Sequence, residues 1–191
     1  MTSDDLKAAM TAAGMTDNDT RAMIAAICMG ESAMQGYTEH GYAHTSNDRI
    51  REVFGSRVSG LDDDALDALK ADDRRFFDRV YGAQFHVGQE LGNTNPDDGY
   101  NFRGRGFIQL TGRANYERYS RIIGHPEIMS DPDLANEPAI AALLAVAYIR
   151  ERYHGGGFEA MMRCVGNNTP DIAASKEAYY AQFRASGEFD A

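Results

Sequence analysis

Two glutamates near the start of the chain have the residue type and the spacing of an acid–base pair. Glu31 follows an apolar run whose members recur at helical spacing, and Glu39 comes eight residues later in a stretch of glycines and polar residues. A carboxyl group beside apolar side chains loses hydration, which favours the protonated form that a general acid needs. A carboxylate flanked by Thr38 and His40 should instead stay ionised and act as a general base.

The separation of these two carboxylates depends on where the helix ends. On one continuous helix, eight residues would place them about 12 Å apart along the axis. A loop after Glu31 removes that constraint and permits the roughly 6.5–9.5 Å that an inverting glycosidase needs to hold a water molecule between acid and base. Because the chain has 29 acidic residues, this pair alone does not identify a reaction.

The segment from residue 100 to 116, YNFRGRGFIQLTGRANY, is unusually rich in glycine, arginine and aromatic residues. Its glycines allow the backbone to turn or to approach another segment closely. Gln109, Thr111, Asn115 and Tyr116 supply uncharged hydrogen-bonding groups suited to a neutral ligand rich in hydroxyls and amides, such as a sugar polymer. A glycine-rich structural hairpin is the alternative interpretation, and spacing alone favours neither.

Apolar residues at helical spacing predict that most of the chain is α-helical. A first helix ends at Gly14, and a second, which Thr16 can cap, carries Glu31 in its last turn. Thr111 can cap the helix after the glycine-rich segment. Further helices are predicted to start at Ser46 and to cover residues 61–69, 72–81, 137–153, 158–165 and 170–183. The segment 137–153 is expected to be the central buried helix.

The composition indicates a globular protein and excludes several classes. The 191 residues suffice for one domain with a substantial core, and 43% of them are hydrophobic. No stretch approaches the roughly 20 apolar residues of a membrane span, and the N-terminus lacks the features of a secretory signal peptide. The net charge of −10 argues against a nucleic-acid partner and against adhesion to an anionic surface.

Neither the cysteines nor the histidines form a pattern that predicts a cofactor. Cys28 and Cys164 lie far apart on predicted helices and are expected to be free thiols. Of the five histidines only His40 and His44 are close together, and no cysteine or carboxylate completes a zinc pattern around them. We expect no metal and no cofactor.

Two segments resemble one known family. AAICMGESAMQGYTEHGY, residues 25–42, resembles the catalytic-acid segment of glycoside hydrolase family 19, the chitinase-like fold that includes many phage endolysins. LGNTNPDDGYNFRGRGFIQLTGRANY, residues 91–116, is similar to the second signature of that family over its whole length. With the helices around them, the resemblance covers most of residues 20–183.

The resemblance implies roles for individual residues. Glu31 corresponds to the general acid and Glu39 to the general base, while Thr111 occupies the place of the hydroxyl that orients the attacking water. The expected substrate-binding residues are Gln109, Asn115, Tyr116, Tyr100, Arg103, Tyr42, Asn167 and Lys176.

The sequence also departs from the family pattern. Gly30 replaces the usual histidine before the acid, and a Gly-Asn-Asn sequence replaces an Asn-Gly-Gly turn near Asn167. Lys176 stands where the family has an arginine, and a lysine cannot reproduce the two-pronged arginine fork. Since the chain has no tryptophan, tyrosines would have to stack on the sugars.

Together these features predict a mainly α, lysozyme-like α+β single domain over residues 1–191, with a small β-hairpin beside the active-site groove. The expected function is that of an endolysin-type glycosidase that hydrolyses β-1,4 bonds of bacterial peptidoglycan by inversion. The resemblance implies a monomer, without signal peptide, that reaches the cell wall from the host cytoplasm after holin-type release. The alternatives are a chitinase, a lytic transglycosylase that needs only one carboxylate, and a non-catalytic wall-binding phage module.

Overall fold

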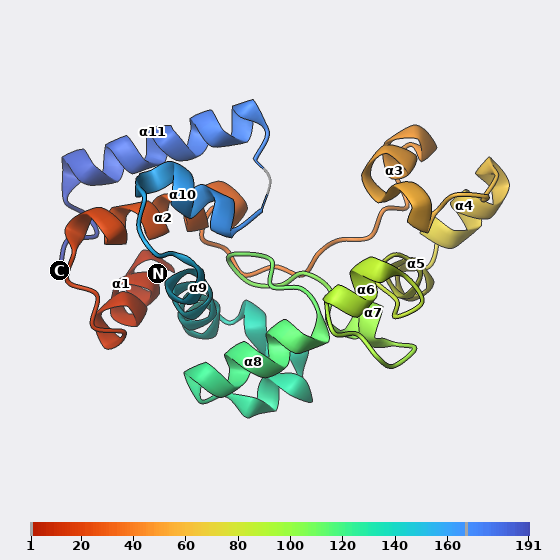
Figure 1. Cartoon of the computed structure of the whole chain (residues 1–191), viewed down its shortest axis with the longest axis horizontal. Helices are drawn as coiled ribbons and strands as arrows, with labels where there is room; N and C mark the ends of the chain where they lie inside the picture. The colour runs from red at the N-terminus through yellow and green to blue at the C-terminus, as the bar shows by residue number, and fades with distance from the viewer. Residues whose placement is uncertain (1, 167) are drawn as a thin grey trace. The chain divides into compact units, whose positions relative to one another are not determined.

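The computed structural model describes residues 2–166 and 168–191, drawn as a ribbon in Figure 1. Of this part of the chain 64% is helical, in 11 α-helices and three 3₁₀ helices, and strands are nearly absent from it. The prediction of a mainly α fold is therefore confirmed.

Contacts divide the chain into two compact units, each built from separate segments. The first unit consists of the described parts of Met1–Tyr37, Arg105–Leu110 and Tyr119–Ala191, and the second of Thr38–Gly104 and Thr111–Arg118. One helix, α8 (Arg113–Ile123), begins in the second unit and ends in the first. The single catalytic domain over residues 1–191 stays a prediction.

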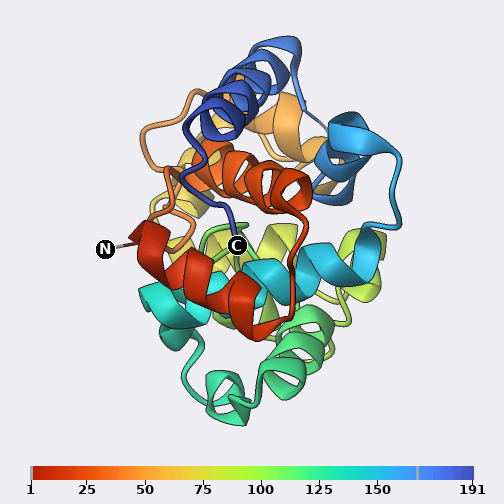
Figure 2. The same ribbon diagram turned by 90° about the vertical axis from the view of Figure 1, so that its left-hand side faces the viewer.

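The first unit is a group of packed helices. Its elements are α1 (Thr2–Ala12), α2 (Asn18–Ser32), η2 (Pro126–Met129), η3 (Pro132–Asn136), α9 (Pro138–Arg152), α10 (Gly157–Cys164) and α11 (Pro170–Ser186). α2 packs along α11, and α1 packs along α9 (Figure 1 and Figure 2). Helix α9 matches the predicted buried helix, because its small and aliphatic residues from Ala141 to Ile149 are mostly buried.

The second unit is built around aromatic side chains. Its elements are α3 (Asn47–Phe54), η1 (Gly55–Arg57), α4 (Asp63–Lys70), α5 (Asp73–Val80), α6 (His86–Glu90), α7 (Asp98–Asn101) and the start of α8. The core cluster contains Ile50, Phe54, Val58, Leu66, Leu69, Phe76, Phe77 and Val80. Phe54 and Phe76 meet edge to face, with ring centroids 5.1 Å apart, a geometry that aromatic quadrupoles favour.

Polar side chains start the helices largely as predicted. Ser46 accepts a hydrogen bond from the N–H of Arg49 at 3.3 Å, which confirms its predicted capping role. Helix α2 is capped by Asp17 instead of Thr16, since the Asp17 carboxylate accepts the N–H of Thr20 at 2.7 Å. Asp62, Asp72 and Thr169 cap α4, α5 and α11 in the same way.

The predicted β-hairpin is reduced to one antiparallel bridge in the described residues. Arg105 and Leu110 exchange backbone hydrogen bonds of 3.2 and 2.8 Å. Between them the chain turns through Gly106 and Gln109, whose φ angles are 74° and 52°. A Cβ at Gly106 would lie 2.7 Å from the backbone oxygen of Ala135, so this tight turn requires glycine for space as well as for conformation.

Neighbouring backbone groups of the second unit explain why the bridge does not extend into strands. The N–H of Gly104 donates to the side chain of Glu39 at 3.3 Å instead of to a ladder partner. The N–H of Gly112 donates to the carbonyl of Phe102 at 2.7 Å, one residue away from the position that a regular ladder would pair.

Asp98 holds the loop that leads into the glycine-rich segment. Its carboxylate accepts two hydrogen bonds from the Arg113 guanidinium, at 2.7 and 2.6 Å, and one each from the N–H groups of Thr94 and Asn95 at 2.8 Å. Although burial alone would raise the pKa of this carboxyl, the Arg113 and backbone hydrogen bonds lower it to about 2.

Two further predictions can be compared with the structure. Cys28 and Cys164 are both free thiols, as expected. In the part of the chain that the structure describes, no helix has the length and apolar character required to cross a membrane.

We predict that Asp98→Asn lowers the free energy of unfolding at pH 7 by about 2 to 4 kcal/mol, because it leaves Arg113 without its carboxylate. The pKa of this carboxyl in the folded protein lies below its ordinary value of 3.8. The contribution of the carboxylate is therefore complete above about pH 4 and is lost as the pH falls through about 2. Urea unfolding between pH 2 and 7 should show a flatter pH dependence in Asp98→Asn than in the wild type. The exposed Asp64→Asn is the control, and equal slopes for Asp98→Asn and the wild type would contradict the prediction.

Candidate active site

Glu31 lies in the last turn of α2, where the sequence predicted it. The helix ends directly afterwards because Ala33 adopts a left-handed conformation with φ 52°. The preceding apolar face of the helix, which includes Ile24, Ile27 and Cys28, is fully buried. About a quarter of the Glu31 side chain, 24%, is exposed, so the carboxylate is accessible from one side only.

Lys176 of α11 is the main partner of Glu31. Its side chain is fully buried, and its Nζ contacts the Glu31 carboxylate and the side-chain oxygen of Asn168. An ammonium group withdrawn from water costs several kcal/mol unless it is paired, and this arrangement supplies both a charge partner and an acceptor. The expectation that Lys176 binds substrate therefore needs correction: in this structure it is an internal ion-pair partner.

Gly30 makes room for this lysine. A Cβ at Gly30 would come within 3.0 Å of Lys176 Cε and 3.3 Å of Lys176 Cδ. The histidine expected here from the family resemblance would meet the same methylene groups. Gly30, which replaces the histidine of the family pattern, and Lys176 of α11 therefore depend on each other for packing.

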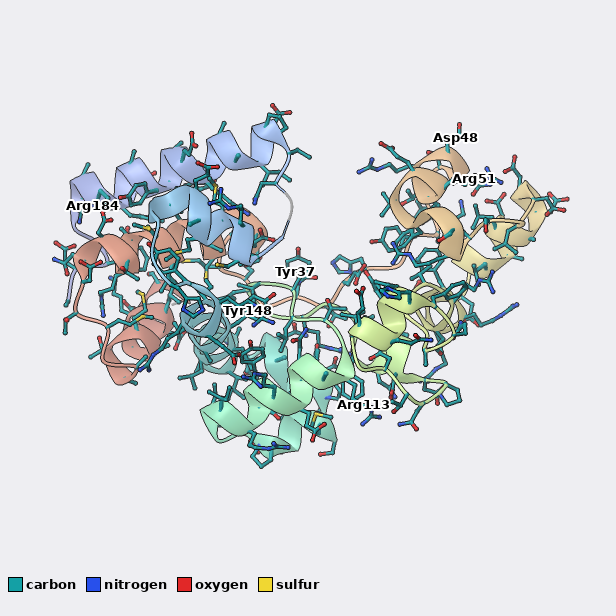
Figure 3. The ribbon with its side chains drawn as sticks, viewed as in Figure 1. Tyr37, Asp48, Arg51, Arg113, Tyr148 and Arg184 are labelled. Carbon is teal, nitrogen blue, oxygen red and sulfur yellow. The ribbon has the colours of Figure 1, made fainter. Side chains whose placement is uncertain are left out.

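The charge of Glu31 acts on two other groups of the first unit. Burial, followed by the Glu31 charge, raises the pKa of the Cys28 thiol to about 12, so this thiol is unreactive. Tyr148 of α9 has a pKa raised by burial and by the charges of Cys164 and Glu31. The Arg152 guanidinium lies 3.6 Å from the centre of the Tyr148 ring (Figure 3). The sequence analysis missed Tyr148 as a site residue because its spacing along α9 is that of a core position.

The Glu39 carboxylate, in the second unit, accepts hydrogen bonds from three donors on other residues. Its Oε1 accepts hydrogen bonds from the hydroxyl groups of Tyr42 at 2.9 Å and Tyr81 at 3.1 Å. Its Oε2 accepts the N–H of Gly104 at 3.3 Å, and its own N–H donates to the Gly104 carbonyl at 2.7 Å. Carboxylate oxygens accept hydrogen bonds, so these three donors fix the orientation of the Glu39 side chain. Its expected role as a general base stays a prediction.

Tyr42 acts in this structure through its hydroxyl and not as a sugar platform. Its ring packs against Phe54 and Phe76, with centroids 5.1 and 5.0 Å away. Burial, followed by the charge of Glu39, raises the pKa of the Tyr42 hydroxyl above its ordinary range. Tyr81, which the sequence analysis did not single out, has its pKa raised by the same two causes. The sequence signal that could have indicated Tyr81 is its position directly after the apolar face of α5.

Thr111 precedes α8 but is not the residue directly before it. The helix begins at Arg113, whose N–H donates to the side chain of Asn93 at 2.9 Å. The N–H of Ala114 donates to the carbonyl of Leu91 at 3.1 Å. The loop before the helix thus provides acceptors for the first two N–H groups of α8. The sequence had suggested Thr111 as the residue that caps this helix. The Thr111 carbonyl accepts a hydrogen bond from the side chain of Asn115 at 2.8 Å, which fixes these two expected site residues to each other.

Tyr116 is a core residue of the structure. It is fully buried, its ring packs on Phe102 with centroids 5.2 Å apart, and its hydroxyl donates to the Arg103 carbonyl at 3.0 Å. A fully buried ring presents no face on which a sugar can stack. The expected ligand contact is therefore corrected to a supporting role beneath the glycine-rich segment.

The other expected binding residues are more accessible. Gln109 donates from its side-chain amide to the carbonyls of Tyr37 at 3.0 Å and Gly106 at 3.2 Å, and Tyr37 is labelled in Figure 3. Tyr100 has the guanidinium groups of Arg74 and Arg103 over its ring, at 4.5 and 3.9 Å from the centroid. Such cation–π contacts fix the orientation of the ring.

Asn167, the remaining expected binding residue, lies outside the described residues. Its neighbour Asn168 contacts Lys176, as described above. Among the residues that the structure describes, no group of three or more histidine, cysteine or acidic side chains is placed to hold a metal ion.

Neither candidate carboxylate lines the hollow described in its own unit. A hollow of about 540 Å³ in the first unit is lined by α1, α8 and α9, with Ala9, Ile122 and Val146 among its residues. Neither Glu31 nor Lys176 lines it. A second hollow, of about 380 Å³, is lined by residues of α3, η1 and α6 and does not include Glu39.

Comparison of the chain with models of protein families and with curated proteins gives no match. The function is therefore argued from the two carboxylates and the groups that hold them.

We predict that Gly30→Ala lowers the free energy of unfolding by about 1 to 3 kcal/mol, the usual cost of overpacking a filled interior. The added methyl group would collide with the Lys176 stem, which cannot move away because its Nζ is bound to Glu31 and Asn168. Denaturant unfolding of Gly30→Ala measures this cost.

The matched background is Lys176→Ala, which removes the methylene groups that the new methyl would meet. In that background Gly30→Ala should cost much less, so the double-mutant cycle should give a coupling energy above about 0.5 kcal/mol. Additive effects of the two substitutions would contradict this account of Gly30.

Proposed function

We propose that this protein is a glycosidase that hydrolyses β-1,4 bonds of bacterial peptidoglycan with inversion, using Glu31 as general acid and Glu39 as general base. The observation that carries the proposal is that each of these carboxylates is oriented by dedicated side chains. Glu31 is held by the buried Lys176, and Glu39 by Tyr42 and Tyr81. A carboxylate that serves only solubility needs no such partners.

The reaction follows from the two roles. A water molecule attacks the anomeric carbon and gives its proton to Glu39. The bond between that carbon and the glycosidic oxygen breaks, and the leaving oxygen takes the proton of Glu31. One water is consumed per bond, and both carboxyl groups return to their starting states by exchanging protons with solvent. The Thr111 hydroxyl is proposed to hold the attacking water.

Within the proposal, the Lys176 ammonium group stabilises the negative charge that Glu31 carries after its proton has moved to the leaving oxygen.

Peptidoglycan glycan strands are the proposed substrate because the resemblance is to phage-type endolysins of family 19. A lysozyme-like α+β domain with a β-hairpin, monomeric action and release from the host cytoplasm belong to the same proposal. Tyr100, Arg103, Gln109 and Asn115 are the proposed sugar-binding residues. Their hydrogen-bonding and aromatic groups suit a neutral, hydroxyl-rich polymer.

The decisive experiment is mass spectrometry of the fragments released from purified peptidoglycan by the wild type, Glu31→Gln and Glu39→Gln. The wild type should release fragments with ordinary reducing ends, and each variant should be at least about 100-fold slower, because each removes one proton-transfer group. Circular dichroism should show that both variants remain folded. A Glu39→Gln variant that retains activity and gives 1,6-anhydro ends would establish a lytic transglycosylase instead.

Parallel assays distinguish a peptidoglycan hydrolase from a chitinase and from a wall-binding module. Soluble chitin oligomers, tested beside peptidoglycan, should be cleaved more slowly, and the reverse order would make the protein a chitinase. Binding to peptidoglycan without any bond cleavage would identify a wall-binding module. The mass of the new reducing end also tells whether the N-acetylmuramic acid or the N-acetylglucosamine bond is cut.

Thr111 allows a separate test of the water-positioning role. Thr111→Val replaces the hydroxyl by a methyl group of similar size, so kcat should fall at least about tenfold while stability changes by less than about 1 kcal/mol. Thermal unfolding and initial-rate assays measure the two effects. Thr111→Ser, which keeps the hydroxyl, should retain most of the activity. An equal loss of stability and activity in Thr111→Val would assign the residue a structural role.

A further inference from the structure

The two oxygens of the Glu39 carboxylate have different surroundings. Oε1 accepts two phenol hydrogen bonds, at 2.9 Å from Tyr42 and 3.1 Å from Tyr81. Oε2 accepts one backbone N–H, from Gly104, at the longer distance of 3.3 Å. A carboxylate oxygen has two lone-pair sites, so Oε1 is filled by the two tyrosines and Oε2 keeps one site.

The phenols are themselves held in place by the aromatic core of the second unit. Tyr42 packs against Phe54 and Phe76 of the core cluster, as described above. Tyr81 stacks on Phe77, with ring centroids 6.0 Å apart and planes 14° from parallel. The Tyr81 carbonyl also accepts a hydrogen bond from the Asn93 side chain at 2.8 Å. The two hydroxyl groups therefore belong to separate segments of the chain, and both tyrosine rings pack against the same core cluster.

The charges around this group are few. The Arg57 guanidinium lies 6.0 Å from the centre of the Tyr81 ring and 4.9 Å from that of Phe54. The charges of Arg57 and Arg49 act to lower the pKa of the Tyr42 hydroxyl, and the charge of Arg57 acts in the same direction on the pKa of Tyr81. Of the partners that Glu39 is shown to have, the two phenols are thus the direct side-chain donors.

From this geometry we infer that Tyr42 and Tyr81 are positioning residues that clamp Glu39 by Oε1, which leaves Oε2 as the oxygen that accepts the proton of the attacking water. The inference rests on the proposed hydrolytic function and assigns the base of that function to one atom. The clamp fixes the direction in which Oε2 points, because two phenols held by the aromatic core occupy the other oxygen. Neither tyrosine exchanges a proton in the reaction.

The kinetic test uses Tyr42→Phe, Tyr81→Phe and the double variant. Each removes one donor and keeps the ring, so kcat should fall about three- to tenfold per tyrosine while KM changes less than about twofold. A purely structural role would lower the amount of folded protein, measured by circular dichroism, and leave kcat per folded molecule unchanged.

The matched control is Tyr180→Phe in the first unit. Tyr180 also donates its hydroxyl to a carboxylate, that of Asp19, at 2.6 Å. This variant loses the same kind of hydrogen bond, yet kcat per folded molecule should stay as in the wild type. An equal fall of kcat in Tyr180→Phe, or no fall in the Tyr42 and Tyr81 variants, would overturn the inference.

A second measurement does not depend on activity. Tyrosines labelled with ¹³C at Cζ can be compared by NMR at pH 7 in the wild type and in Glu39→Gln. The Cζ signals of Tyr42 and Tyr81 should both move, because their hydroxyls lose the charged acceptor, whereas the Tyr180 signal should stay in place. Tyr42 and Tyr81 signals that do not move would disprove the clamp.

The two measurements separate the inference from the proposed function. If peptidoglycan is not cleaved but the two tyrosine signals move in Glu39→Gln, the clamp stands and the hydrolytic function is wrong. If peptidoglycan is cleaved and the two signals do not move in Glu39→Gln, the function stands and the clamp is wrong.

Discussion

The burial of one lysine is the constraint on which the first unit depends. Lys176 is fully enclosed, and an enclosed ammonium group is tolerated only where a charge partner and an acceptor lie against it. Glu31 and Asn168 meet that requirement. Because Lys176 belongs to α11 and Glu31 to α2, the pair also fixes how these two helices pack. Gly30 is the residue on α2 that leaves space for the lysine stem.

The second unit holds its carboxylate by a different physical means. Glu39 has neutral phenol donors and a backbone N–H around it, and the phenols are rigid because their rings belong to an aromatic core. A lysine stabilises a carboxylate by charge, whereas phenols do so by directed hydrogen bonds that also define which oxygen is occupied. The two glutamates are therefore held by different kinds of partner.

Helix positions and caps were largely predictable from the sequence, because they depend on neighbouring residues. Ser46 caps its helix as predicted, and Glu31 lies in the last turn of α2. The β-hairpin was not predictable in the same way. Its residues have the right pattern, but Gly104 donates to a side chain 65 positions away, and a ladder cannot extend through a backbone group that is already bonded elsewhere.

Local spacing in the sequence determined the mainly α architecture and the free cysteines, and it marked the two glutamates only as candidates for proton transfer. Only the tertiary structure decided which polar groups pair inside the protein. It turned Lys176 from an expected sugar ligand into the partner of Glu31, placed Tyr116 in the core, and joined Tyr42 with Tyr81 on Glu39. The physical reason is that periodicity shows which residues are buried, whereas the partner of a buried polar group can lie 145 residues away and is selected by the need to satisfy it.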